Sequence, residues 1–114
     1  MVRFRLIRQV RLGHFPQAVE AAEALSAREQ ALAGPEATHW LVVGGPVNTL
    51  ITETEFSSLR TLEEWVEKAD ADAEHIRLRQ KAAEHSIEGT TRVEILKTAP
   101  HLAREESVPL VAHV

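Results

Sequence analysis

The residues of this chain that could do chemistry are chiefly its histidines. The 114 residues include six histidines and no cysteine, so a disulfide, a thiolate metal site and a catalytic thiol are excluded. A bound metal or haem would have to be held by histidine, carboxylate or water. No two histidines have the His-x3-His spacing that places two ligands on one helix face, so the sequence predicts no metal site.

Two histidines suit acid–base chemistry, because imidazole titrates near neutral pH. His14 follows the first predicted strand and His39 begins the second. Either could take a proton from an acidic phenol or enol substrate, or both could simply be exposed or hydrogen bonded at a turn. The chain has neither a G-x-S-x-G motif nor a glycine-rich loop leading into a helix.

Arg8 stands out because it interrupts an apolar stripe. From Val2 to Leu12 the apolar residues fall on even positions, which is typical of a half-buried strand, yet Arg8 is also even. A charge that faces a core is costly unless it is paired or reaches an opening. Arg8 could therefore line a cavity and anchor an anionic or carbonyl group of a ligand. Alternatively, it could pair with Glu29, or a strand bulge near Ile7 could reverse the register.

The elements that position these residues follow from the same patterning. It predicts strands at residues 2–12, 38–45, 49–56 and 90–98, and helices at 16–33 and 59–87. The second helix is expected to begin after Ser57 or Ser58 and to end at Gly89, with a possible break at 68–74. This β-α-β-β-α-β order is that of the α+β ferredoxin-like fold, a four-stranded antiparallel sheet with both helices on one face.

The charge of the chain is unevenly placed. Four arginines and no acid lie in the first twelve residues, whereas the formal net charge of the whole chain is −4. The overall charge argues against a nucleic-acid partner. The basic start lacks the apolar run of a signal peptide, and no apolar run approaches the ~20 residues of a membrane span. We therefore expect a cytoplasmic protein without a membrane partner.

One face of the predicted sheet is charged. The first and third strands are central neighbours in a ferredoxin-like sheet, so Arg3 and Arg5 are expected to lie opposite Glu53 and Glu55 on the face away from the helices. Opposite charges across a ladder contribute about 0.2–1 kcal/mol each.

Several segments carry a family resemblance. They are the Pro46-Val47-Asn48 turn, the strand that ends in Glu55-Phe56, the Ser-Leu-Arg-Thr-Leu-Glu-Glu-Trp segment 58–65, and Ala73-Glu74-His75 after an acidic, alanine-rich turn. Over residues 2–98 the chain resembles the dimeric α/β-barrel superfamily, close to antibiotic-biosynthesis-monooxygenase-like and NIPSNAP-like proteins. The resemblance implies a homodimer whose two sheets pack face to face, with an apolar cavity in each subunit between sheet and helices.

The resemblance also implies three functions. The first is a cofactor-independent, monooxygenase-like enzyme that acts on an apolar or aromatic small molecule, with His75, Trp65 and Arg8 as its catalytic residues. The second is a non-catalytic ligand-binding or stress-response barrel. The third is haem binding or degradation, in which His75 would ligate the iron and Trp65 would ruffle the haem. The haem-degrading branch uses an Asn on the first strand, which this sequence lacks, and both residues could instead pack between helix and sheet.

The end of the chain lies outside the resemblance. We expect residues 1–98 to form the domain and residues 99–114 to form a tail. The Ser-Val-Pro-Leu-Val run of the tail predicts an edge strand or a strand exchanged with another subunit, because Pro109 fits an edge better than a sheet centre.

Overall fold

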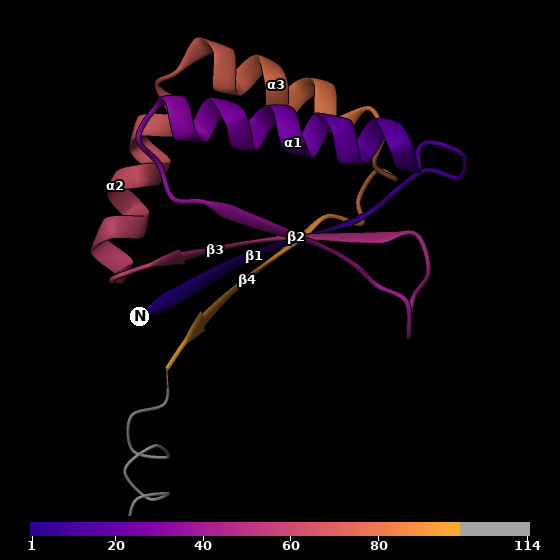
Figure 1. The fold of residues 1–114 in the computed structure, drawn as a ribbon, viewed down its shortest axis with the longest axis horizontal. Helices are drawn as coiled ribbons and strands as arrows, with labels where there is room; N and C mark the ends of the chain where they lie inside the picture. The colour runs from indigo at the N-terminus through magenta and orange to yellow at the C-terminus, as the bar shows by residue number, and fades with distance from the viewer. Residues whose placement is uncertain (99–114) are drawn as a thin grey trace, which may run out of the picture.

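The structure is a computed structural model, and it describes residues 1–98. The predicted tail strand within 99–114 lies outside the described residues. Four strands and three helices follow one another along the chain: β1 Val2–Gln9, α1 Phe15–Ala31, β2 Ala37–Leu41, β3 Thr49–Phe56, α2 Leu59–Asp70, α3 Ala73–Ala83 and β4 Arg92–Lys97. All three helices lie on one face of the sheet, and the other face is left open (Figure 1).

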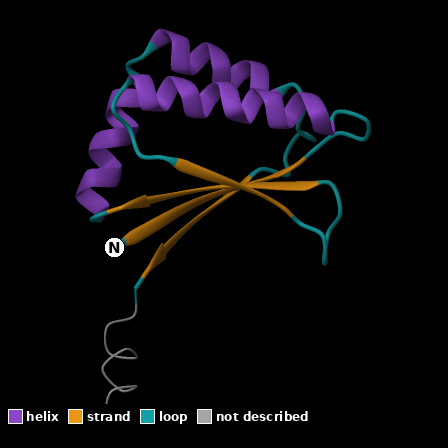
Figure 2. Cartoon of the chain, in the orientation of Figure 1, coloured by secondary structure: helices purple, strands orange, loops and turns teal. Residues whose placement is uncertain are grey.

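The sheet has the topology that the sequence predicts. Its strand order is β2-β3-β1-β4, and every neighbouring pair is antiparallel. The predicted α+β ferredoxin-like fold is therefore confirmed, with the second helix divided into α2 and α3 (Figure 2). The register of β1 against β3 runs without interruption from Val2 opposite Phe56 to Gln9 opposite Thr49. The bulge proposed near Ile7 is therefore wrong.

Three predicted boundaries differ from the structure by three residues or more. The first strand ends at Gln9, because the chain then turns away and leaves Leu12 94% exposed. The second strand ends at Leu41 rather than at residue 45. The last helix ends at Ala83, six residues before Gly89, because the backbone N–H of Ile87 donates to the carbonyl of Gln9 at 2.8 Å and draws this segment towards β1.

The predicted helix break is confirmed, and Asp72 fixes it. Asp72 is the N-cap of α3, and its carboxylate accepts a hydrogen bond from the backbone N–H of His75 at 2.8 Å. Arg28 of α1 donates two further hydrogen bonds to this carboxylate, at 2.9 and 2.6 Å. The start of α3 is thereby fixed to α1, which places the side chain of His75 under the helices.

The Asp72 contacts make stability depend on pH. Hydrogen bonds from Arg28 lower the pKa of Asp72 to about 2, below the unfolded value of about 3.9. A depressed carboxyl pKa stabilises the fold above the unfolded value, and this contribution is lost as the pH falls through the folded value. We expect Asp72→Asn to lower the melting temperature by about 5 °C at pH 7 and by much less at pH 2. Calorimetry between pH 7 and pH 2 measures this, and an equal deficit at both ends would contradict it.

The core is divided into two apolar clusters. One contains Val10, Ala18, Ala22 and Leu50, and the other contains Val2, Phe56 and Leu62 with Phe4 and Trp65 packed against it. Between them, the helix-facing positions of the central strands carry Arg8, Thr52 and Thr54. Polar side chains in the middle of the sheet thus separate the two halves of the core.

The open face of the sheet carries the predicted ion pairs. Arg3 donates to Glu55 at 3.1 Å and Arg5 to Glu53 at 2.9 Å, so the predicted pairing of arginine with glutamate across the ladder is confirmed. An apolar band crosses the same face, because Ile51 lies opposite Ile7 on one side and opposite Trp40 on the other. Trp40 is 53% exposed.

Candidate functional site

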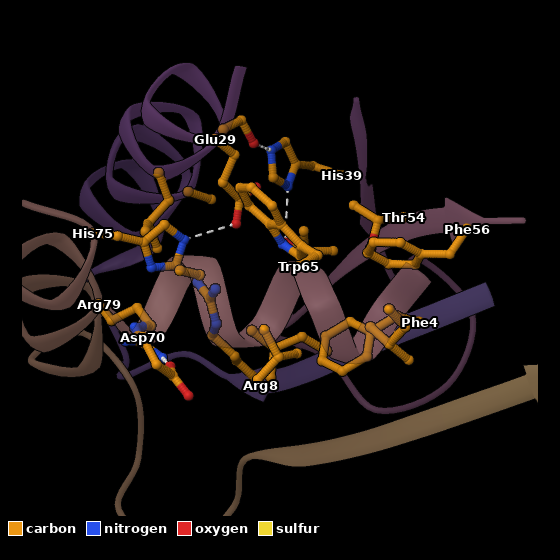
Figure 3. Close-up of a pocket in the computed structure, with 18 residues that line it drawn as sticks. Phe4, Arg8, Glu29, His39, Thr54, Phe56, Trp65, Asp70, His75 and Arg79 are labelled. Atoms are coloured by element: carbon orange, nitrogen blue, oxygen red, sulfur yellow. Dashed lines mark hydrogen bonds and ion pairs between the residues drawn. The ribbon is translucent and has the colours of Figure 1, made fainter. Parts of the chain in front are cut away.

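A cavity of about 260 Å³ lies between the sheet and the three helices (Figure 3). Strands β1, β2 and β3 form its floor, and α1, α2 and α3 form its roof. It is lined by Phe4, Leu6, Arg8, Ala22, Leu25, Ser26, Glu29, His39, Thr52, Thr54, Phe56, Leu62, Trp65, Val66, Ala69, Asp70, His75 and Arg79. Apolar walls with a few polar groups are typical of ligand sites.

Arg8 rises from β1 into this cavity, between His75 and Trp65 (Figure 3). Its side chain belongs to the helix-facing set of β1 because the strand has no bulge. Arg8 is only 8% exposed. Burial lowers the pKa of Arg8, and the negative charge of Glu29 opposes that shift. The cavity therefore contains a cation that has lost most of its hydration.

Glu29 binds His75 rather than Arg8. The Nε2 atom of His75 lies 3.0 Å from Oε2 of Glu29, and a carboxylate can only accept, so Nε2 carries the hydrogen. The ion pair predicted between Arg8 and Glu29 is therefore wrong, because His75 of α3 occupies the carboxylate. The other ring nitrogen, Nδ1, is buried and has no hydrogen-bond partner among the described residues.

On the cavity floor, the ring of His39 lies between two hydroxyl groups, one from α1 and one from β3. One ring nitrogen lies 2.9 Å from the Ser26 hydroxyl and the other lies 2.9 Å from the Thr52 hydroxyl. Burial lowers the pKa of His39, and the charge of Arg8 lowers it further. His39 is therefore neutral at pH 7, the form that a general base requires. In the neutral ring one nitrogen donates and the other accepts, so a substrate hydroxyl could replace only the hydroxyl that donates to the ring.

Trp65 closes the cavity from α2. Its ring meets that of His75 edge to face, with the centroids 6.3 Å apart and the planes at 86°, an arrangement that aromatic rings favour. The other side of the indole lies against Gly34, where an added Cβ would be 2.5 Å from the ring. Gly34 is therefore required by the close approach of Trp65, while the helix itself ends with Ala33 in the left-handed region.

Gly34→Ala is expected to displace Trp65 and to lower the free energy of unfolding by about 1–3 kcal/mol, the usual cost of overpacking. Gly44→Ala is the matched control, because an added Cβ there meets nothing within 4 Å. Urea unfolding of the two variants measures the difference. Equal stability would show that the indole moves aside freely.

The structure brings the three predicted site residues together. Arg8, Trp65 and His75 all line the same cavity, although their catalytic roles stay predictions. His39 lines it as well. His14 does not belong to the lining, and its Nδ1 atom lies 3.2 Å from the Nδ1 atom of His85.

Sequence reasoning missed five polar residues of the lining: Ser26, Thr52, Thr54, Asp70 and Arg79. A signal for the threonines was present, because Thr52 and Thr54 share the parity of the buried Leu50 and Phe56. A polar side chain at a core-facing strand position indicates a site by the same argument that singled out Arg8. Ser26 has a similar signal, since it lies one helical turn from Glu29.

The residues present do not fit a haem. His75 Nε2 is bound to Glu29 and Nδ1 is buried, so neither nitrogen is open to an iron. The cavity of about 260 Å³ is also below the ~300–1,000 Å³ that encloses drug-sized ligands, and haem is larger than most of these. Within residues 1–98, no group of three or more His, Asp or Glu side chains could hold a metal ion.

The structure is that of a ferredoxin-like α+β protein with a cavity between its sheet and its helices. Its structure is similar to those of a NIPSNAP family protein of unknown function from Agrobacterium tumefaciens (20% identity, TM-score 0.72, covering 87% of this chain and 88% of that chain) and a NIPSNAP domain protein from Burkholderia xenovorans (11%, 0.74, 87% and 95%). It is also similar to an antibiotic biosynthesis monooxygenase (13%, 0.63, 88% and 100%). No family model and no curated protein matches the sequence.

At these identities the likeness establishes the fold alone. The resemblance inferred from the sequence is thereby confirmed for the architecture, while activity is a separate question. Among the described helices, none is both long and apolar enough to cross a membrane.

Proposed function

We propose that this protein binds a small apolar or aromatic molecule in the cavity and oxidises it without a cofactor, as a monooxygenase-like enzyme. The observation that carries the proposal is the cavity itself. Its apolar walls surround a few buried polar groups, among them Arg8, His39 and the His75–Glu29 pair. The neighbour named as a monooxygenase supports this reading through its shared fold.

The residues of the cavity suit proton removal from a phenol or enol. Neutral His39 accepts the proton, and the charge of Arg8 favours the anion that forms. With anthrone as substrate, one oxygen atom of O2 becomes the new carbonyl, and the other leaves as water with the two methylene hydrogens. The products are anthraquinone and water, so no external reductant is needed.

Binding is tested first, by NMR. The chain has two tryptophans, and Trp65 lines the cavity whereas Trp40 lies on the open face. The neutral bicyclic probe 2-naphthamide should shift the indole N–H signal of Trp65 and leave that of Trp40 in place. A titration that moves neither signal would contradict the binding proposal.

Catalysis is tested by oxygen uptake with anthrone. The wild type should consume one O2 per anthrone, and His39→Asn should lose most of this uptake while still binding 2-naphthamide. Binding without uptake would instead support the non-catalytic ligand-binding barrel. Uptake that survives in His39→Asn would remove His39 as the base.

We also propose that the open sheet face joins two copies of the chain. The band of Ile7, Ile51 and Trp40 would supply the apolar contact, and the surrounding arginine–glutamate pairs the polar rim. Light scattering after gel filtration should give twice the 12.7 kDa chain mass, and Trp40→Glu should reduce it to that of one chain. A particle of one chain mass in the wild type would contradict this proposal.

A further inference from the structure

Arg8 is a buried cation in the cavity, and the fold alone does not account for its charge. We infer that the natural ligand of the cavity is an aromatic or apolar monoanion whose carboxylate binds Arg8. This inference rests on the proposed function and names the chemical class of its ligand. Its basis is the burial of Arg8, its lack of a direct partner and the apolar walls beside it.

Arg8 is buried without a direct counter-ion. It is 92% buried, since only 8% of it is exposed, and within residues 1–98 no hydrogen bond or ion pair engages its guanidinium, on which Glu29 acts only through its charge. A guanidinium that has lost water and gained no partner is destabilising. It is also the group that gains most from an incoming carboxylate, because it has five N–H donors in a planar fork.

Both acidic side chains of the cavity lining already accept a hydrogen bond from another residue. Glu29 accepts from His75 at 3.0 Å, and Asp70 accepts from Arg79 at 2.8 Å. Glu29 acts on Arg8 through its charge but not by contact. Neither carboxylate of the lining therefore contacts Arg8, and the guanidinium of Arg8 is available to a ligand.

The surroundings of Arg8 indicate what else the ligand contains. Phe4 shares the cavity-facing side of β1 with Arg8, and Phe56 and Trp65 complete an apolar wall (Figure 3). A flat ring fits between these side chains, with its acidic end towards Arg8. One unpaired cation balances one negative charge, which favours a carboxylate over a phosphate dianion.

The experiment compares two probes of one shape. 2-Naphthoate and 2-naphthamide differ in charge but hardly in size, and both are titrated while the Trp65 indole N–H signal is followed. Wild type should bind naphthoate at least about tenfold more tightly than naphthamide, because hydrogen bonds to a charged group are worth that much or more.

Arg8→Gln should remove the preference, weakening naphthoate about tenfold and changing naphthamide less than about twofold. Arg8→Met, which keeps the apolar bulk, repeats the test should the glutamine variant fold poorly. Arg5→Gln is the matched control, because Arg5 lies on the same strand but on the open face, and it should keep the wild-type preference.

The outcomes separate the inference from the proposed function. Equal affinity of the wild type for both probes would overturn the inference and leave the binding site standing. A naphthoate preference that survives in Arg8→Gln and Arg8→Met would also overturn it, since another group would then hold the anion. Failure of both probes to move the Trp65 signal would overturn the proposed function itself.

Discussion

Replacing Glu29 by alanine is expected to lower the free energy of unfolding by about 3 kcal/mol. His75 is only 5% exposed, and its Nε2–H donates to Glu29. The substitution leaves this donor buried without a partner. It also removes the carboxylate whose charge favours the protonated form of Arg8, so two buried groups lose stabilisation at once. Urea unfolding followed by circular dichroism measures the loss.

Two further variants separate these contributions. Glu29→Gln keeps an acceptor for His75 and removes only the charge, so its cost should be about 1 kcal/mol. Glu23→Ala on the exposed side of the same helix should change stability by less than about 0.5 kcal/mol. If Glu29→Ala were as stable as Glu23→Ala, the His75–Glu29 pair would not contribute to the fold.

Replacing Arg8 by methionine is expected to raise the free energy of unfolding of the ligand-free protein by about 1–2 kcal/mol. Methionine fills much of the same volume, and it removes a buried cation that forms no hydrogen bond or ion pair with a described residue. A gain in stability on removing a charged side chain is typical of residues kept for function. Thermal and urea unfolding without ligand measure it.

Arg5→Met is the matched comparison, because Arg5 is on the same strand but pairs with Glu53 and Glu94. It should lose up to about 1 kcal/mol. In the Arg8→Met background, Glu29→Gln should also cost less than in the wild type, since the attraction between the two charges is gone. A large loss of stability in Arg8→Met would instead identify Arg8 as a structural group.

The fold could be predicted because each strand and helix shows its own period. The alternation in residues 2–12 and 49–56 placed β1 and β3 as strands with a charged face, and the expected pairing of arginines with Glu53 and Glu55 follows from that parity. Helix and strand ends were less predictable. They depend on contacts between distant segments, such as the N–H of Ile87 with the carbonyl of Gln9.

The candidate site could be predicted in part for the same reason. Arg8 was identifiable because it breaks a local pattern, and Trp65 and His75 because they belong to a recognisable segment. The partner of Glu29 was not predictable, since the meeting of α1 and α3 depends on where Asp72 ends the break. The position of His39 opposite Thr52 likewise depends on the register of β2 against β3.

The inferred ligand of the cavity is an aromatic anion that Arg8 holds. A crystal structure of the protein grown with 2-naphthoate tests this inference most directly. We predict ring density between Phe4 and Trp65, with both carboxylate oxygens about 2.7–2.9 Å from the guanidinium nitrogens of Arg8. A cavity closed by side chains and free of ligand, with Arg8 paired to Glu29, would contradict the claim.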